Sequence, residues 1–312
     1  MVDHIFFTTV ALFASRAFAQ PLSGPETSFR WNYPALEVVR TGEFSYYPPL
    51  TLPDFERYFY ANGFAPFVSL QYEWSYFILG STLPQLNGFV VTAQFAATLV
   101  LVYSIVAANS DRLAGLAAAA ILASSWLVFW TFHFGQETGW IAFALVAALW
   151  CCRSSHLRLL PVAHLSLAFA LLPALVAREY GPVFIGAGVL FALSSGARLC
   201  ELALFVGISV ALAAPWYMYV WLGCGNPFYT LSPLGLFPTN PVIDHLLAAT
   251  HESRALLQHP GVLAHRALDL VLNSPLLVVA GCFALFAWRW HRAILLVAGL
   301  VVALWCSAVG YS

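Results

Sequence analysis

Charged side chains are scarce in this 312-residue chain, so the few that lie outside its long apolar segments mark where chemistry could take place. Glu26 lies in a polar, aromatic-rich loop after the first apolar segment, whereas Glu137 and the Arg178-Glu179 pair lie in short turns between later apolar segments. An arginine at the end of an apolar helix can hold a phosphate oxygen through charge-assisted hydrogen bonds. Arg178 could equally neutralise Glu137 or Glu179 in a structural salt bridge. Glu137 could likewise be an acid that merely begins a helix and reaches water.

The composition indicates a helical membrane protein. Hydrophobic residues make up 61% of the chain and charged residues 9%, and the mean hydropathy is +0.79. Its apolar segments approach the ~20 residues that a helix needs to cross a hydrocarbon core, whereas an isolated strand would leave its backbone unpaired in lipid. We therefore expect an all-α, polytopic transmembrane protein with about nine or ten spans, folded as a single domain over residues 1–312. The expected spans are 4–19, 86–107, 113–131, 138–152, 159–177, 181–196, 199–222, 267–288 and 293–310, with a tenth at 64–82 that Glu73 and several aromatic residues interrupt.

The arginines indicate how the chain is laid across the membrane. Short connections that carry arginine favour the cytoplasmic side, and here they alternate with two long loops, 20–63 and 223–266. We expect those loops, and the turns that hold Glu137 and Arg178, on the extracytoplasmic side of the membrane. The arginines of the short connections are Arg112, Arg153, Arg158, Arg198, Arg289 and Arg292.

The first apolar segment has two interpretations. Ala17-Phe18-Ala19 before Gln20 resembles a signal-peptidase site, which would make the segment a cleaved signal peptide. Asp3 and His4 stand where a positively charged region would precede such a segment, and this favours a retained first span. Both interpretations put Glu26 outside the cytoplasm.

Other kinds of partner and site are disfavoured by the composition. All 13 basic residues are arginine and the net charge is −1, so we expect no broad basic surface for nucleic acid. The cysteines suggest neither a structural disulfide nor a zinc site, because only Cys224 falls in an outer loop and the spacing matches no zinc motif. The others lie in or at the inner ends of the expected spans: Cys151, Cys152, Cys200, Cys282 and Cys306.

Residues 27–40 of the first outer loop can form an amphipathic helix along the membrane surface. Gly42 is a natural stop for this helix, and its apolar positions recur at roughly helical spacing, at Phe29, Tyr33, Leu36 and Val39. Glu26 then lies at the helix N-terminus, where the helix dipole favours a carboxylate. Glu26 either caps this helix or is held there for chemistry.

Taken in order, these features resemble the GT-C superfamily of membrane glycosyltransferases. The resemblance is to the bacterial relatives of dolichyl-phosphate-mannose protein mannosyltransferases and to lipid-A aminoarabinose transferases, and it covers residues 10 to about 230. The residues that carry it are Arg16, Glu26, Arg40-Thr41-Gly42-Glu43-Phe44, Pro48-Pro49, Glu137, Arg178-Glu179, Pro215-Trp216 and Gly225-Asn226-Pro227-Phe228-Tyr229.

The resemblance implies a donor in which a sugar is linked through phosphate to a polyprenyl chain, and an acceptor hydroxyl on a lipid, glycan or protein. It implies that Glu26 is the general base and that Glu137 is a second acid that orients the acceptor or a divalent metal. Arg178 would bind the donor phosphate, with Arg254 and Arg266 as further candidates for that role. Glu179 and Tyr180 would line the site, and no cofactor is firmly required.

Two further interpretations remain open. Pro25 stands where the family commonly has an aspartate before the loop glutamate, and the chain ends soon after 293–310, where relatives usually add more helices. Both departures favour a non-catalytic subunit of a membrane complex. The other alternative is a small-solute or lipid transporter. A transporter should carry polar residues near the middle of its spans, whereas the acids of this chain lie mainly at the outer ends of the expected spans.

Overall fold

The structure is a computed structural model that describes residues 2–19, 22, 27–43, 50–58, 65–153, 163–229, 232, 236–249, 268 and 272. Within these ranges the chain forms helices and no strand, which confirms the expected all-α class. The elements are α1 (Val2–Ala19), η1 (Thr27–Asn32), α2 (Tyr33–Thr41), α3 (Leu52–Arg57), α4 (Phe67–Leu79), η2 (Pro84–Leu86), α5 (Asn87–Asn109), α6 (Arg112–Ser124), α7 (Trp126–His133), α8 (Glu137–Arg153), α10 (Ala163–Leu175), α11 (Val183–Ser194), α12 (Leu199–Cys224) and α13 (Pro241–Ala249).

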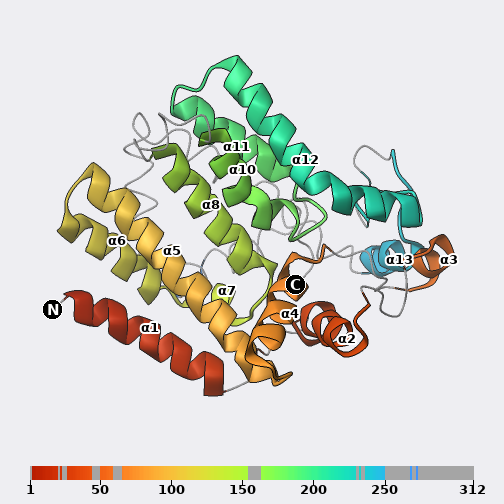
Figure 1. Ribbon diagram of the computed structural model, residues 1–312, viewed down its shortest axis with the longest axis horizontal. Helices are drawn as coiled ribbons and strands as arrows, with labels where there is room; N and C mark the ends of the chain where they lie inside the picture. Colours follow the sequence, from red (N-terminus) through yellow and green to blue (C-terminus); the bar gives the residue numbers. More distant parts are fainter. Residues whose placement is uncertain are drawn as a thin grey trace.

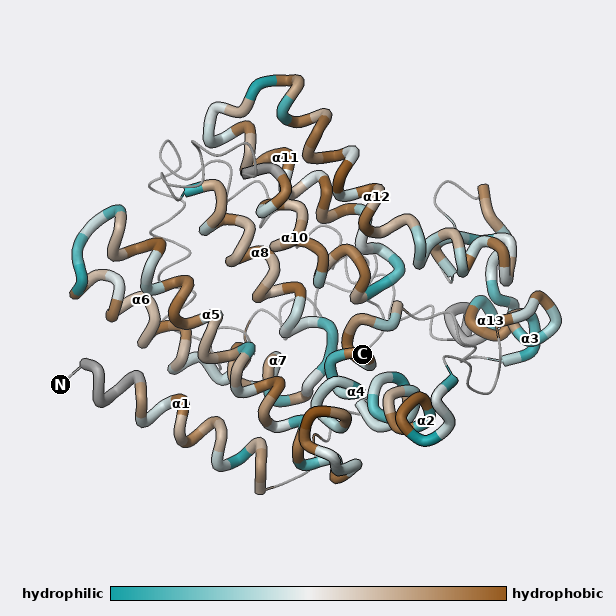
Figure 2. The backbone as a smooth tube through the Cα atoms, in the orientation of Figure 1, coloured by the Kyte–Doolittle hydropathy of each residue, from teal (hydrophilic) through white to brown (hydrophobic). Residues whose placement is uncertain are grey.

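The helices form an array with two distinct ends (Figure 1). At one end, which we call the arginine end, lie the turn between α5 and α6, the C-terminus of α8 and the turn between α11 and α12. These segments carry Arg112, Arg153 and Arg198. The opposite end, which we call the loop end, holds α2, α3 and α13 together with the start of α8. Figure 2 shows hydrophilic residues at the turns of both ends and mainly apolar residues along the helices between them.

Two of the described helices are long and apolar enough to cross a membrane, Pro84–Asn109 and Leu199–Cys224. Each has 26 residues and so extends about 39 Å, more than a hydrocarbon core of about 30 Å. Helices α6 and α7 would make a third span if the bent pair counts as one. Helix α4 has 13 residues and is too short to cross a core of about 30 Å by itself.

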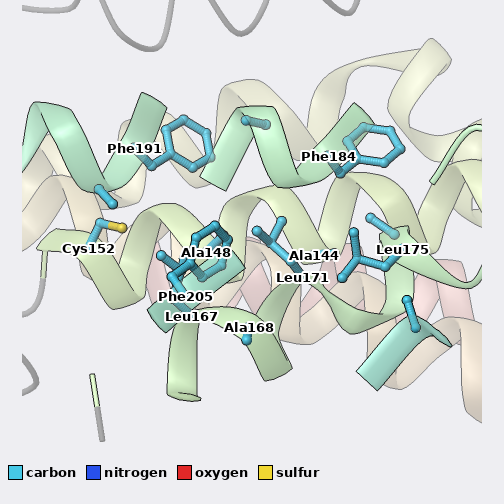
Figure 3. Close-up of a cluster of buried hydrophobic side chains, with 14 of the residues drawn as sticks. Ala144, Ala148, Cys152, Leu167, Ala168, Leu171, Leu175, Phe184, Phe191 and Phe205 are labelled. Carbon is cyan, nitrogen blue, oxygen red and sulfur yellow. The ribbon is translucent and has the colours of Figure 1, made fainter. Parts of the chain in front are cut away.

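Small side chains let α8 and α10 pack closely in one of the two large hydrophobic cores (Figure 3). Ala144 and Ala148 of α8 face Leu171 of α10, and Phe205 of α12 fills the space against Gly188 of α11. The second core joins α1, α4, α5 and α7, with Trp31 of η1 added from the first loop. Its largest members are Phe13, Trp31, Tyr72, Tyr76, Phe95 and Phe132.

Helices occupy the expected spans within the described residues, but only 86–107 and 199–222 correspond to helices that are long and apolar enough to cross a membrane. One expected span is broken. The segment 113–131 is not one continuous helix, because the chain breaks at Ser125 and α7 continues at an angle of 69° to α6. Ser125 has an extended backbone, and its side chain accepts a hydrogen bond from the Val128 N–H at 3.3 Å. Serine can cap a helix in this way, which starts a new helix rather than continuing the first.

A helix is also observed at the other surface position that the sequence predicts within the described ranges. The predicted helix 27–40 is observed as η1 followed by α2, and Gly42 ends it with a left-handed backbone (φ 73°) and an N–H bonded to the Val38 carbonyl at 2.8 Å. The expected spans 267–288 and 293–310 lie outside the described residues, apart from Leu268 and Leu272.

Candidate active site

The most prominent charged contact of the loop end is an ion pair between Glu137 and Arg178. Glu137 is the first residue of α8, where the helix dipole stabilises a carboxylate. Its side chain is only 4% exposed, and its Oε1 lies 2.7 Å from the Nε of Arg178, whose side chain is 20% exposed. Glu179 adds a second, longer contact, with its Oε1 3.7 Å from the Nη1 of Arg178. One guanidinium group therefore serves two carboxylates.

The turn that carries Arg178 is held in place by α12. The hydroxyl of Tyr217 donates its one proton in a bifurcated hydrogen bond to the carbonyl oxygens of Leu175, at 2.8 Å, and of Arg178, at 3.2 Å. Gly181 completes the turn, and a Cβ at this position would lie 2.0 Å from the Leu175 carbonyl oxygen and 2.8 Å from the Tyr217 hydroxyl. Only glycine fits so tight a turn. The backbone that positions Arg178 is thus fixed by a tyrosine and a glycine.

The carboxylate of Glu137 has a second oxygen atom besides the one that contacts Arg178. Among the described residues, the second carboxylate oxygen of Glu137, Oε2, is buried and has no hydrogen-bond partner. An unsatisfied buried acceptor is costly. A ligand hydroxyl that donated to Oε2 would remove this cost.

Tyr180 contributes a neutral hydroxyl beside the ion pair. The guanidinium carbon of Arg178 lies 5.9 Å from the centre of the Tyr180 ring. Burial raises the pKa of Tyr180 to about 12, although the charge of Arg178 opposes this shift. At neutral pH the phenol keeps its proton, so Tyr180 can donate a hydrogen bond to a ligand but cannot act as a base.

The first loop reaches the same region through Thr27. Its hydroxyl donates a hydrogen bond to the Phe134 carbonyl oxygen at 2.6 Å and accepts one from the side-chain amide of Gln136 at 3.4 Å. Both partners belong to the turn that leads directly into Glu137. Gly135, the middle residue of that turn, has a positive φ of 64°, and its carbonyl accepts a hydrogen bond from the Tyr72 hydroxyl.

The far end of η1 is fixed by a second, buried polar network. The side-chain oxygen of Asn32 accepts hydrogen bonds from the Tyr76 hydroxyl and, at 3.1 Å, from the side-chain amide of Asn87. Asn87 also donates to the Tyr76 hydroxyl at 2.8 Å and accepts from Ser75 at 2.7 Å. Helix η1 is therefore attached at its first residue to the Glu137 turn and at its last residue to α4 and α5.

The structure brings together four of the residues that the sequence singled out: Glu137, Arg178, Glu179 and Tyr180. Glu26, Arg254 and Arg266 lie outside the described residues. Sequence reasoning missed the positioning contacts of Thr27, Gln136 and Tyr217. Nothing in the sequence around Tyr217 indicates that its hydroxyl reaches a turn about 40 residues earlier.

In the part of the chain that the structure describes, no three histidine, cysteine, aspartate or glutamate side chains group as metal ligands. The described cysteines, Cys151, Cys152, Cys200 and Cys224, are free thiols.

Comparison with known proteins yields no relative: no family model, no curated protein and no solved structure matches the chain. The chemistry of the site must therefore be inferred from its own residues and their geometry.

Proposed function

We propose that this chain is an integral membrane glycosyltransferase that moves a sugar from a polyprenyl-phosphate donor to an acceptor hydroxyl. One observation carries the proposal. The bond from Thr27 to Phe134 ties the residue directly after Glu26 to the turn that begins α8, and the first residue of α8 contacts Arg178. Thr27, Glu137 and Arg178 thus come from chain segments that meet at the loop end, and this supports a site shared by the acids and the arginine that the resemblance assigns to catalysis.

In the proposed reaction, the acceptor oxygen attacks the anomeric carbon of the donor sugar. The bond from that carbon to the phosphate oxygen breaks, and its electron pair stays with the phosphate. The acceptor proton passes to the carboxylate of Glu26, and Arg178 stabilises the charge that the phosphate gains. A single displacement of this kind inverts the configuration at the anomeric carbon.

Glu137 has two tasks in this scheme. Its Oε1 holds the guanidinium group of Arg178 at 2.7 Å, and its unpartnered Oε2 is available to accept a hydrogen bond from the acceptor or the sugar. The neutral phenol of Tyr180 donates to the phosphate or the sugar from beside Arg178. Glu179 competes with the donor phosphate for Arg178, and its longer contact of 3.7 Å makes it the weaker competitor.

The proposed membrane arrangement follows the arginine distribution. The arginine end lies in the cytoplasm and the loop end on the extracytoplasmic face of a bacterial inner membrane, with about nine or ten spans in all. The polyprenyl tail of the donor lies against apolar helices, and its phosphate enters the loop end from the lipid.

The direct test is transfer of a labelled sugar by the purified protein in liposomes. A panel of polyprenyl-phosphate sugars is offered with the lipid extract of the source membrane as acceptor, and a labelled product is expected with at least one donor. A wild-type protein that binds polyprenyl phosphate but transfers none of the sugars would favour the non-catalytic subunit. The contacts of Arg178 with two carboxylates fit that alternative too, because a salt bridge needs no substrate.

A further inference from the structure

Arg16 lies in the last turn of α1 against the aromatic face of α7. The carbon at the centre of its guanidinium group is 5.0 Å from the ring centre of Trp130, 5.7 Å from that of Phe129 and 5.9 Å from that of Trp126. Trp126 and Phe129 are stacked with an angle of only 2° between their planes. Three rings thus form a surface on which a cation is held by cation–π attraction.

Cation–π contacts use none of the N–H donors of a guanidinium group, so these donors remain able to form hydrogen bonds. The five N–H donors of arginine lie in the plane of the group and match the oxygens of a phosphate. Arg16 is exposed, and no carboxylate or hydrogen-bond acceptor contacts it among the described residues. This cation is therefore positioned by aromatic rings and has no anionic partner within the described part of the protein.

The neighbours of Arg16 indicate what kind of anion reaches it. Leu12, one helical turn before Arg16, is 66% exposed, and Trp126 is 46% exposed on the other side of the contact. An anion that binds Arg16 therefore has an apolar protein surface directly beside it. A phospholipid can contact both the arginine and the apolar surface, because its phosphate and its acyl chain are covalently joined.

From these contacts we infer that Arg16 and the aromatic face of α7 form a binding site for an anionic phospholipid. The lipid phosphate bonds to the edge of the guanidinium group, and an acyl chain lies along α1 over Leu12. Its arginine has other surroundings than that of the proposed donor site: Arg178 is mostly buried and pairs with Glu137, whereas Arg16 is exposed and contacts no carboxylate among the described residues. The site would bind a structural lipid of the leaflet at the loop end.

Native mass spectrometry of the delipidated protein in detergent tests the site. Phosphatidylglycerol and phosphatidylcholine are titrated separately, and a preference for the first lipid is expected in the wild type. Arg16→Gln should weaken the tightest phosphatidylglycerol binding by about tenfold or more, since hydrogen bonds to charged groups have roughly that effect on affinity. Arg16→Lys should recover only part of the loss, because an ammonium group lacks the planar edge.

Arg40→Gln is the matched control, because Arg40 is also an arginine near a helix end, and its side chain is 80% exposed and contacts Glu37. It should bind phosphatidylglycerol as the wild type does. Trp130→Leu removes the nearest ring but keeps the charge, so it should also weaken binding, and it serves if Arg16→Gln does not fold. Equal binding of both lipids by the wild type, equal losses in Arg16→Gln and Arg40→Gln, or displacement of the lipid by millimolar inorganic phosphate would each overturn the inference.

Discussion

Thr27 donates a hydrogen bond of 2.6 Å to the carbonyl oxygen of Phe134, a residue 107 positions later in the chain. Phe134 follows the last residue of α7, so its carbonyl belongs to the group of acceptors that a helix leaves without an internal partner. A buried side chain of the first loop satisfies this acceptor. The bond links the loop that carries Glu26 to the turn that begins at α7 and ends at Glu137.

Thr27→Val should lower kcat while the protein still folds, because it keeps the shape of the side chain and removes the hydroxyl. Misplacement of a reacting group by about 1 Å can cost about 100-fold in rate, so we expect a fall of about tenfold or more. Thr27→Ser retains the hydroxyl and should restore most of the rate. Steady-state kinetics with a polyprenyl-phosphate sugar as donor measures kcat for each variant. A purely structural role would lower thermal stability and leave the kcat of the folded Thr27→Val protein unchanged.

Arg178→Ala should weaken the binding of polyprenyl phosphate by about tenfold or more, because charge-assisted hydrogen bonds to phosphate are lost. Arg178→Lys should recover only part of the affinity, since an ammonium group cannot form two parallel bonds. Binding can be measured by fluorescence titration with a labelled lipid phosphate.

Glu137→Gln helps to distinguish phosphate binding by Arg178 from a purely structural salt bridge. The amide oxygen of glutamine can still accept a hydrogen bond from Arg178, and one negative charge near the phosphate is removed, so lipid phosphate should bind as tightly as to the wild type or more tightly. If Arg178 formed only the salt bridge, folded Arg178→Ala would bind lipid phosphate as the wild type does.

Gly181→Ala should destabilise the protein, because the added Cβ would lie 2.0 Å from the Leu175 carbonyl oxygen. Removing this clash requires the turn to move, and with it the backbone of Arg178. Gly186→Ala is the matched control: Gly186 lies in α11, and a Cβ added there would meet no atom of the described residues within 4 Å. The control should be neutral or more stable by up to about 1 kcal/mol, because alanine favours helix. Thermal unfolding in detergent compares the two, and equal melting temperatures would contradict the tight turn.

Cysteine labelling in intact cells tests the orientation of the two ends. In a background without native cysteines, Glu43→Cys at the loop end should react with a membrane-impermeant reagent, and Ser110→Cys at the arginine end should not. Both positions are exposed, so access depends on the side of the membrane. The reverse pattern would put the loop end in the cytoplasm and exclude a donor that faces outward.

Hydrophobic periodicity and length predict most of the described helices, because a membrane-crossing segment must be apolar over its whole length. Residues 86–107 and 199–222 were expected as spans, and they correspond to α5 and α12. The break at Ser125 was not predictable in this way, since one serine between apolar residues barely alters the hydropathy.

The sequence also does not indicate which distant residues its polar side chains contact. Glu137 and Arg178 could be singled out because charges at the ends of apolar segments are rare. Their pairing at 2.7 Å depends on how α8 and α10 pack, and the hydrogen bonds of Tyr217 depend on how α12 packs against α10. Nothing in the sequences around Thr27 and Phe134 indicates that a hydrogen bond joins these two residues.

Glu26→Gln tests the central claim most directly, because it preserves the shape of the proposed base and removes its ability to accept a proton. Loss of a positioned base costs about 100-fold to 10,000-fold in rate. Glu37→Gln is the control, because Glu37 lies in the same loop and its carboxylate contacts the exposed Arg40, at 3.6 Å. In the liposome assay, transfer by Glu26→Gln should fall below detection while donor binding persists, and Glu37→Gln should transfer the sugar at nearly the wild-type rate. Near-normal transfer by Glu26→Gln would contradict the assignment and make Glu137 the next candidate for the base.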